Sequence, residues 1–251
     1  MLVHNGGLVK TVNFGNPKYV GDPINAVRIF NEKEVDELFV VDIDATRLGR
    51  EPNYEVIRNL AAECRMPLSY GGGVSTVEQI ERIITLGVEK VALSAACAAN
   101  PDIIDQARIR VGSQSIVAVM DVKRTGLFRK MECVTHNATK STGKNPVEMA
   151  RIYEQAGAGE IVVNSVDRDG VMQGYDLDLV AQVRDAVSLP LTVLGGAGSL
   201  DDISDLIQRH HIIGAAAGSL FVFKGKYRAV LINYPTRGEK DALLAGAGAQ
   251  V

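Results

Sequence analysis

The chain has 251 residues, of which 46% are hydrophobic and 23% are charged, a composition typical of an ordinary globular protein and not of a disordered or collagen-like one. Its formal net charge of −3 gives no bulk positive field of the kind that nonspecific nucleic-acid binding uses, although a small phosphorylated ligand is compatible with it. The sequence has no apolar run of about 18 residues and no signal peptide, so we expect neither a membrane span nor export.

Cysteine and histidine usage indicates a reducing compartment and no metal. The three cysteines, Cys64, Cys97 and Cys133, are far apart and form no C-x-x-C pair, so neither a disulfide framework nor a zinc site is predicted. The four histidines show no metal-ligand spacing. We therefore expect a cytoplasmic protein that uses no metal and no cofactor.

Short runs of Val, Ile and Leu alternate with longer segments of helical period, which is typical of a parallel sheet covered by helices. The pattern predicts seven strands, at 38–44, 67–70, 90–94, 115–121, 160–166, 190–194 and 214–219. It also predicts eight helices, at 22–34, 53–64, 76–86, 100–111, 146–156, 176–187, 200–210 and 225–233. Residues 127–134 are predicted as a hairpin, followed by a mobile loop at 138–145.

The first strand is short in this pattern, because Asn5, Gly6 and Gly7 turn the chain directly after residues 1–3. With it the count reaches eight strands and eight helices, and the length fits the roughly 250 residues of a (β/α)8 TIM barrel. Either the true start lies upstream of Met1, or the barrel has a stunted seam between its eighth and second strands. We expect one domain over 1–251, with a loosely ordered tail at 235–251.

Two pairs of segments recur about half a chain length apart. Residues 66–75 (MPLSYGGGVS) resemble 189–199 (LPLTVLGGAGS), and 40–44 (VVDID) resembles 162–167 (VVNSVD) in the same phase. One matched glycine cluster arises easily by chance, whereas two matched pairs in a common phase do not. The repeat therefore predicts that two similar half-barrels make up the fold.

Glycines follow the third and seventh predicted strands, on the face where such a barrel carries its chemistry. Gly72, Gly73, Gly195 and Gly196 precede helix starts, so their backbone N–H groups can hold phosphate; the plainer interpretation is a tight turn. Residues after strands 4, 6 and 8 complete the predicted phosphate-binding set, namely Ser94, Asp169, Gly170, Gly218 and Ser219. Two such groups on opposite sides of the mouth predict a substrate with two phosphates.

A single carboxylate ends the longest apolar strand. Asp121 follows residues 116–120, where a partly desolvated carboxyl group serves as general acid or base. The alternative is a structural acid paired with Lys123 or Arg124.

Charged residues also stand at the starts of strands 2, 4 and 6. We expect Glu37, Lys90 and Glu160 to meet at the opposite end of the barrel as an ion-paired ring. Residues at that end normally serve stability. Burying charges nevertheless costs more than apolar packing unless something requires a polar route.

Several segments together resemble the cyclase subunit of imidazole glycerol phosphate synthase, over nearly all of residues 2–223. They are VKTVNF at 9–14, GDP at 21–23, YGGG at 70–73, DVKR at 121–124, GAGEI at 157–161, SVDRDG at 165–170 and GGAG at 195–198. The resemblance implies a (β/α)8 barrel that forms a heterodimer with a glutaminase subunit and receives ammonia through its interior. It further implies conversion of a ribulose-type bisphosphate, PRFAR, into imidazole glycerol phosphate and AICAR.

The resemblance also assigns roles to residues already singled out. It makes Asp121 the second of the family's two catalytic aspartates, while the first aligns with Leu2. It places Glu37, Lys90 and Glu160 on three of the four positions of the family's ammonia gate. A missing proton carrier implies a rate lowered by roughly 10²–10⁴-fold.

Other positions depart from the family. The fourth gate residue, an arginine, would lie before Met1. Ser94-Ala95 stands where the family has Asn-Thr, and the segment after Tyr234 is unlike it. These departures allow an ammonia-dependent synthase subunit for amidino sugars of surface polysaccharide, or a non-catalytic partner that passes on ammonia. A bisphosphate sugar isomerase is a further alternative, but it leaves the ring of Glu37, Lys90 and Glu160 without a reason.

Overall fold

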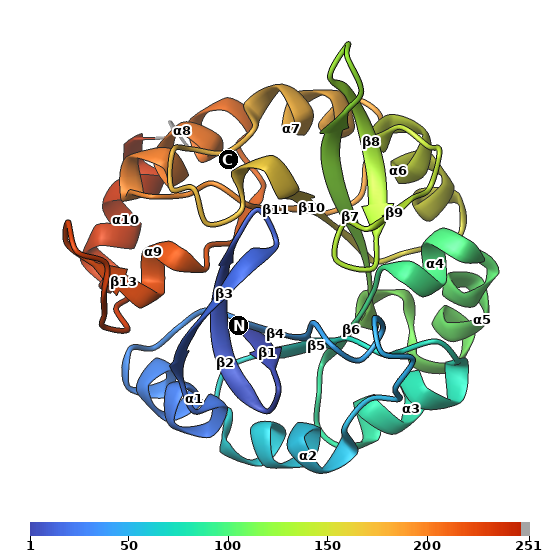
Figure 1. The fold of residues 1–251 in the computed structure, drawn as a ribbon, viewed down its shortest axis with the longest axis horizontal. Coiled ribbons are helices and arrows are strands. Elements are labelled where there is room, and N and C mark those ends of the chain that lie inside the picture. The colour runs from blue at the N-terminus through green and yellow to red at the C-terminus, as the bar shows by residue number, and fades with distance from the viewer. Residues whose placement is uncertain (247–251) are drawn as a thin grey trace.

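Eight parallel strands curve around a common axis, and helices surround them on the outside, in the computed structural model of the protein, which describes residues 1–246 (Figure 1). The strands pair side by side in the order β12-β11-β10-β7-β6-β5-β4-β1. They are β1 (Leu2–His4), β4 (Leu38–Asp42), β5 (Leu68–Gly71), β6 (Lys90–Leu93), β7 (Ile116–Thr125), β10 (Glu160–Ser165), β11 (Leu191–Leu194) and β12 (Gly214–Ala215). This arrangement confirms the predicted (β/α)8 barrel.

Seven of the predicted helices are present. They are α1 (Pro23–Glu32), α2 (Tyr54–Glu63), α3 (Val77–Thr85), α5 (Asp102–Val111), α6 (Pro146–Gln155), α7 (Leu177–Arg184) and α8 (Leu200–His210). Helix α3 illustrates their local causes. Thr76 accepts a hydrogen bond from the backbone of Gln79, whose side chain accepts one from Thr76 in return, which satisfies N–H groups at the helix start. Ile80 and Ile83 then lie fully buried one turn apart, against the sheet.

One of the eight helical predictions is wrong. Residues 225–233 do not form a helix, because Gly225 and Arg228 take positive φ angles and turn the chain into a hairpin of β13 (Phe223–Lys224) and β14 (Ala229–Val230). Within the predicted tail, Arg237–Gly246 forms helix α10, and residues 247–251 lie outside the described part. Two short helices, α4 (Ala95–Ala99) and α9 (Ser219–Val222), were not predicted.

The barrel has a seam beside its first strand. Strand β1 pairs with β4 only through Leu2 opposite Val41 and Val3 opposite Asp42, and in residues 1–246 no ladder joins it to β12. From β1 the chain continues into an antiparallel hairpin of β2 (Gly7–Val12) and β3 (Gly15–Gly21). A similar hairpin rises from β7, which pairs with β8 (Lys130–Thr135) and through it with β9 (Lys140–Ser141), so the hairpin predicted at 127–134 is confirmed.

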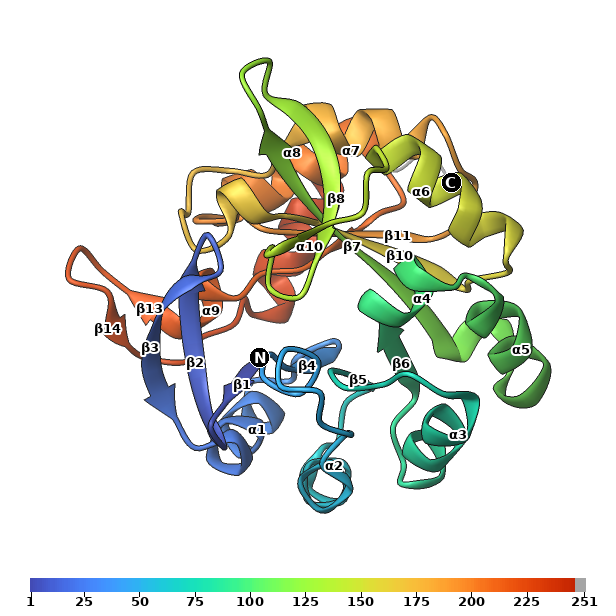
Figure 2. The same ribbon diagram turned by 45° about the vertical axis from the view of Figure 1, so that its right-hand side comes forward.

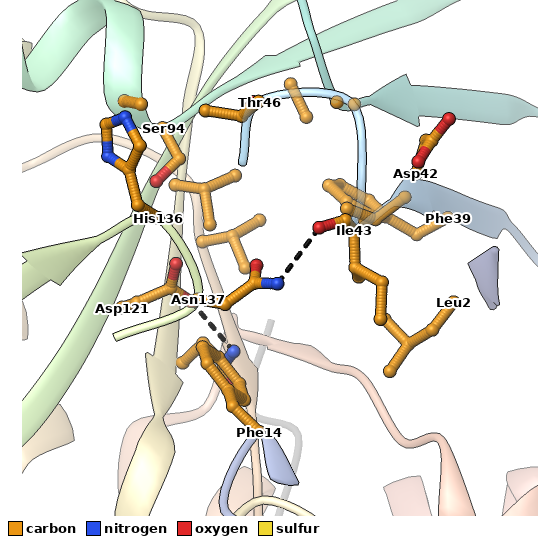
Figure 3. Close-up of a pocket in the computed structure, with 18 of the residues that line it drawn as sticks. Leu2, Phe14, Phe39, Asp42, Ile43, Thr46, Ser94, Asp121, His136 and Asn137 are labelled. Carbon is orange, nitrogen blue, oxygen red and sulfur yellow. Dashed lines mark hydrogen bonds between the residues drawn. The ribbon is translucent and has the colours of Figure 1, made fainter. Parts of the chain in front are cut away.

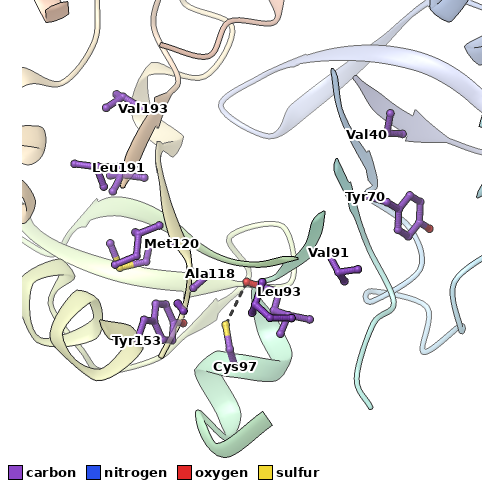
Figure 4. Packing of buried hydrophobic residues seen from close by; sticks show 14 of the residues in the cluster. Val40, Tyr70, Val91, Leu93, Cys97, Ala118, Met120, Tyr153, Leu191 and Val193 are labelled. Carbon is purple, nitrogen blue, oxygen red and sulfur yellow. Dashed lines mark hydrogen bonds between the residues drawn. The ribbon is translucent and has the colours of Figure 1, made fainter. Parts of the chain in front are cut away.

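Side chains alternate between two packing regions along each strand. In β7, Ala118 and Met120 point outward and pack with Tyr153 and other residues beneath the helices (Figure 4). Val117 of the same strand belongs to a separate small cluster inside the barrel, with Val162 and neighbours. The helices thus fix the strands from outside, and the inner face of the barrel carries apolar side chains.

No helix within residues 1–246 is long and apolar enough to cross a membrane.

Candidate active site

A pocket opens where the parallel strands end (Figure 3). Its walls include residues from the ends of β4, β5, β6, β7 and β10, together with residues of the β2–β3 hairpin and of the loop after β8. The predicted site residues among them are Gly72, Gly73, Ser94, Asp121 and Asp169, and Leu2 lies with them in the wall. These five predicted site residues thus meet at the carboxyl ends of the strands, where barrel enzymes carry out their reactions.

Asp121 reaches the pocket from the middle of the extended strand β7. Asn164, on the neighbouring strand β10, donates its side-chain N–H to Asp121 Oδ1 at 2.9 Å. Burial raises the pKa of Asp121 to about 6, and the nearby charge of Asp169 adds to the rise, while the Asn164 hydrogen bond opposes it. A carboxyl group with such a pKa exchanges protons close to neutral pH.

The structural alternative for Asp121 is wrong. The guanidinium of Arg124 bonds to both carboxylate oxygens of Asp176, at 2.9 and 3.1 Å. Neither Arg124 nor Lys123 forms an ion pair with Asp121 in the part of the chain that the structure describes. Asp121 therefore faces the pocket with an amide, not a cation, as its polar neighbour.

The other two carboxylates of the pocket are committed to local structure. Asp42 accepts hydrogen bonds from the backbone N–H groups of Asp44 and Ala45 and so holds the turn after β4. Asp169 accepts one from the Thr11 hydroxyl at 2.7 Å. Leu2, on strand β1 beside the β4 strand of Asp42, brings an apolar side chain to the pocket wall. Of the three carboxylates in this pocket, Asp121 is therefore the one best placed for proton transfer, because the other two hold loops through their hydrogen bonds.

The glycines are needed first for packing. A Cβ on Gly72 would collide with the backbone oxygen of Asp42, and one on Gly196 with that of Gly174. Both also have positive φ angles, 113° and 121°, which other residues rarely adopt. A side chain at either position would therefore disturb the loops themselves before it met any ligand. The backbone N–H of Gly73 already donates to the Thr46 hydroxyl at 3.1 Å.

The predicted phosphate residues fall into two groups, as the repeat suggested. Gly72, Gly73 and Ser94 line the pocket on one side. The other group lies around Lys10 and Thr11 of β2: a Cβ on Gly218 would meet the ammonium of Lys10, and one on Gly170 the backbone oxygen of Thr11. Ser219 directly follows Gly218, whereas Gly195 lies against Ser165 and Gly196 against Gly174. None of these three residues lines the pocket.

Several residues of the site escaped the sequence analysis. They are Phe14, Thr46, His136, Asn137 and Asn164. Asn137 donates its side-chain N–H to the backbone oxygen of Ile43 at 2.9 Å and so ties the loop after β8 across the mouth to the loop after β4 (Figure 3). Asn164 alone had a signal, because it lies near the carboxyl end of the strand predicted at 160–166, within the repeated segment VVNSVD.

The predicted ring at the opposite end of the barrel is present. The Lys90 ammonium lies 3.1 Å from Glu37 Oε2 and 2.9 Å from Glu160 Oε2. Burial lowers the pKa of Lys90, but the hydrogen bonds and charges of Glu160 and Glu37 outweigh that effect and leave it raised. Two carboxylates therefore share one cation.

Hydroxyl groups hold the remaining oxygens of the ring. Ser69 donates to Glu37 Oε1 and Thr192 to Glu160 Oε1, each at 2.7 Å. Ser69 and Thr192 occupy matching positions of the two repeated segments, MPLSY and LPLTV. Their strand neighbours differ, since Ser69 pairs with Lys90 but Thr192 with Gly214. The ring thus follows the duplication except for its single cation.

An apolar region separates the ring from the pocket. Phe39 of β4 lies two residues after Glu37, which directly precedes that strand, and Val162 follows Glu160 by two residues on β10. This spacing of two places each apolar side chain above the charge on the same side of the sheet. Both line the pocket from beneath, together with Ala92, Val119 and Leu194. The interior of the barrel therefore leads from a polar ring through apolar side chains to the pocket that contains Asp121.

Comparison with known proteins agrees with this architecture. A family model described as histidine biosynthesis protein matches residues 1–228. The chain is 58% identical over 244 residues, 97% of its length and 94% of the relative's, to a protein of Vibrio vulnificus (strain YJ016) provisionally named imidazole glycerol phosphate synthase subunit hisF3. It is 54% identical over 243 residues, 97% of its length and 96% of the relative's, to a Leptospira interrogans protein provisionally named imidazole glycerol phosphate synthase subunit HisF.

A third relative, from Pseudomonas aeruginosa, carries the provisional name imidazole glycerol phosphate synthase subunit hisF2 and is 50% identical over 241 residues, 96% of either chain. The family model covers most of the chain and the three relatives match it nearly end to end. The chain belongs to the histidine biosynthesis protein family.

Proposed function

We propose that the protein is an ammonia-using cyclase subunit of the imidazole glycerol phosphate synthase type. The names of its relatives assign them to that synthase. One observation carries the proposal for this chain: the charged ring, the apolar interior and the Asp121 pocket lie in sequence along the same strands. Glu37 directly precedes β4, where Phe39 and Val41 follow at every second position, and Glu160, Val162 and Asn164 follow one another on β10.

The ring is where ammonia would enter. Neutral ammonia crosses an apolar passage without the desolvation cost that ammonium would bear, so the apolar side chains of the interior suit it. A glutaminase subunit docked over Glu37, Lys90 and Glu160 would release ammonia directly into that passage. Without such a partner the ammonia would be lost to bulk water and protonated.

The substrate would be a ribulose-type bisphosphate, PRFAR, spanning the mouth. One phosphate would lie near Gly72, Gly73 and Ser94, and the other near Gly170, Gly196 and Ser219. In this arrangement the two phosphates would be held on either side of the Asp121 carboxyl group. The reacting carbons between the phosphates would then lie over Asp121, in the path of the ammonia, and the products would be imidazole glycerol phosphate and AICAR.

Asp121 would transfer protons to and from the reacting groups, and Asn164 would bind the ammonia nucleophile. The ammonia nitrogen loses protons as it forms its bonds to carbon, and the Asp121 carboxylate would accept one of them and return it to a leaving oxygen. The Asn164 amide offers a complementary contact, because its Oδ1 atom is buried with no hydrogen-bond partner among residues 1–246. An N–H of arriving ammonia would satisfy it.

Leu2 would limit this chemistry. A leucine cannot carry a proton, so the reaction would rely on one positioned acid instead of two, which lowers the rate by roughly 10²–10⁴-fold. The same residue favours a second function, in which the barrel delivers ammonia to another acceptor, such as a sugar that receives an amidino group. In that case Asp121 would be dispensable for delivery.

Turnover of PRFAR by the chain alone, with an ammonium salt as nitrogen source, separates these functions. The cyclase proposal predicts formation of imidazole glycerol phosphate and AICAR in equal amounts, at a low rate. Absence of both products at saturating PRFAR and ammonium would contradict it and leave ammonia delivery as the function.

A further inference from the structure

The β2–β3 hairpin lies beside the β13–β14 hairpin (Figure 2), and these two hairpins carry the cations Lys10, Lys18 and Arg228. Lys10 and Lys18 are direct cross-strand partners in β2 and β3. The Lys18 ammonium lies 5.0 Å, and the Arg228 guanidinium carbon 4.7 Å, from the centre of the Phe223 ring. Lys18 also donates to the backbone oxygen of Arg228 at 3.5 Å. Segments more than 200 residues apart in sequence thus place their positive charges around one aromatic ring.

These charges are not compensated within the protein. Like charges directly opposite each other destabilise an antiparallel pair, yet Lys10 faces Lys18. Among residues 1–246, no carboxylate forms an ion pair with Lys10, Lys18 or Arg228. The arrangement costs free energy in the free protein, which an anionic ligand would recover.

Lys10 is the innermost of the three cations. Its side chain is buried, with 9% of the residue exposed, and its ammonium has no hydrogen-bond partner within the described part of the chain. Asp169 is the acid whose charge acts on it, but that carboxylate bonds to the Thr11 hydroxyl. Most of the Lys10 residue is thus buried, while its ammonium keeps its hydrogen-bonding capacity free, so this position suits an anion.

The inner and outer cations border the same loop. The Lys10 ammonium lies against Gly218, and Arg228 donates from its guanidinium to the backbone oxygen of Gly170 at 3.3 Å. Both glycines belong to the second of the two phosphate groups described above. One cation is therefore placed for a phosphate in that group, and two more stand beside it, farther toward solvent.

We propose that this edge of the mouth binds a diphosphate ester. Lys10 with the Gly218–Ser219 backbone would hold the inner phosphate, and Lys18 with Arg228 the outer one, while Phe223 orients both outer cations through cation–π contacts. Three cations and the Asp169 carboxylate leave a formal excess of two positive charges, which equals the charge of a diphosphate diester. The inner position rests on the proposed function; the outer position does not, since it depends only on Lys18 and Arg228.

Calorimetric titration with inorganic phosphate and with pyrophosphate tests the proposal on the full chain. We expect K18Q/R228Q to weaken pyrophosphate binding by about tenfold or more, as loss of charge-assisted contacts does, and to change phosphate binding by less than about threefold. Lys226, exposed on the same hairpin, supplies the matched control, and K226Q should leave both affinities unchanged. Circular dichroism would verify that each variant is folded.

An equal loss of both affinities in K18Q/R228Q, or no loss of either, would overturn the outer position. Equal binding of the two probes by the parent would do the same. The cyclase proposal is tested separately by turnover of PRFAR, so pyrophosphate binding that depends on Lys18 and Arg228 stands even where no turnover is found. That combination would identify a diphosphate ester as the acceptor class.

Discussion

Asn164 divides its side-chain amide between two tasks. Its N–H group donates to Asp121 Oδ1 at 2.9 Å, and its oxygen is buried in the pocket without a partner among residues 1–246. The amide thus holds the carboxylate and leaves an acceptor free beside it, above the apolar interior. This pairing connects the proton carrier with the place where ammonia would arrive.

Replacing Asn164 should separate those two tasks. In N164L the isosteric apolar side chain leaves Asp121 without its donor and removes the free oxygen, so the ammonium-dependent rate should fall by about tenfold, the typical effect of one lost hydrogen bond to a charged group. In N164D the second carboxylate would raise the pKa of Asp121 further, so the pH at half-maximal rate should move upward. Rate measurements across pH 5 to 9 check both; unchanged rates and pH profiles in both variants would contradict this role.

The raised pKa of Asp121 makes a stability prediction with a definite sign. Since burial raises this pKa from 3.8 to about 6, the folded protein holds the proton more tightly than the unfolded chain between those values. Stability contributed by the protonated form is present below pH 4 and is lost as pH rises through 6. D121N should therefore be more stable than the parent at pH 7 by about 3 kcal/mol and close to it in stability near pH 4.

Urea unfolding at pH 4 and pH 7 measures that difference. D241N, on the exposed surface of α10, serves as the control and should differ little from the parent at either pH. A D121N variant less stable than the parent at pH 7 would show that the carboxylate is compensated in the folded state.

The hydroxyl groups of the ring should matter for coupled activity only. T192V removes the hydrogen bond to Glu160 Oε1 and keeps the side-chain shape, so we expect the glutamine-dependent rate with the partner glutaminase to fall by about tenfold. The rate with ammonium salt should stay unchanged, because that ammonia can enter through the mouth. T192S keeps the hydroxyl and should behave as the parent. An equal fall of both rates in T192V would point to a general loss of structure.

Leu2 is a position where activity should be gained. L2D places a second carboxylate in the pocket wall, and if the parent is a weakened cyclase, the rate with PRFAR should rise by about 10²-fold. L2N, similar in size but unable to carry a proton at neutral pH, is the matched control and should give no gain. Identical rates for L2D and the parent would mean that Leu2 is not what limits turnover.

The glycine loops give a test of the packing argument. In G196A the new methyl group meets the backbone oxygen of Gly174 and the residue keeps a φ of 121°, so we expect a loss of about 2 kcal/mol or more in unfolding free energy. G238A, in helix α10 with open space around it and no positive φ, should gain a few tenths of a kcal/mol instead. Thermal melts of both variants supply the comparison.

The barrel and the ring of Glu37, Lys90 and Glu160 were predictable because both follow from patterns between residues close in sequence. Apolar periodicity marks the strands, and strand starts place Glu37, Lys90 and Glu160 at one end of the axis. Helix α10 also had a local signal that composition obscured: Thr236 and Glu239 form the reciprocal hydrogen bonds of a capping box. The Gly and Ala residues of this segment favour a loose tail, whereas the capping pattern at its first turn favours a helix.

Other features depend on contacts that no local pattern contains. Asn137 reaches the backbone oxygen of Ile43 across 94 positions, and Arg228 reaches Gly170 across 58. The backbone N–H of Gly73 likewise donates to the hydroxyl of Thr46, which lies in another loop. Such pairings are fixed only when the whole barrel has formed, so the shape of the mouth could not be predicted from the sequence.

Passage of ammonia through the barrel is the central claim, and an isotope experiment tests it most directly. The protein and its glutaminase partner are supplied with glutamine labelled with ¹⁵N at the amide, in the presence of excess unlabelled ammonium salt. The account predicts that imidazole glycerol phosphate carries ¹⁵N well above the isotope fraction of the bulk ammonium, and that K90E reduces this enrichment. Product with the isotope fraction of the bulk in the parent complex would contradict it.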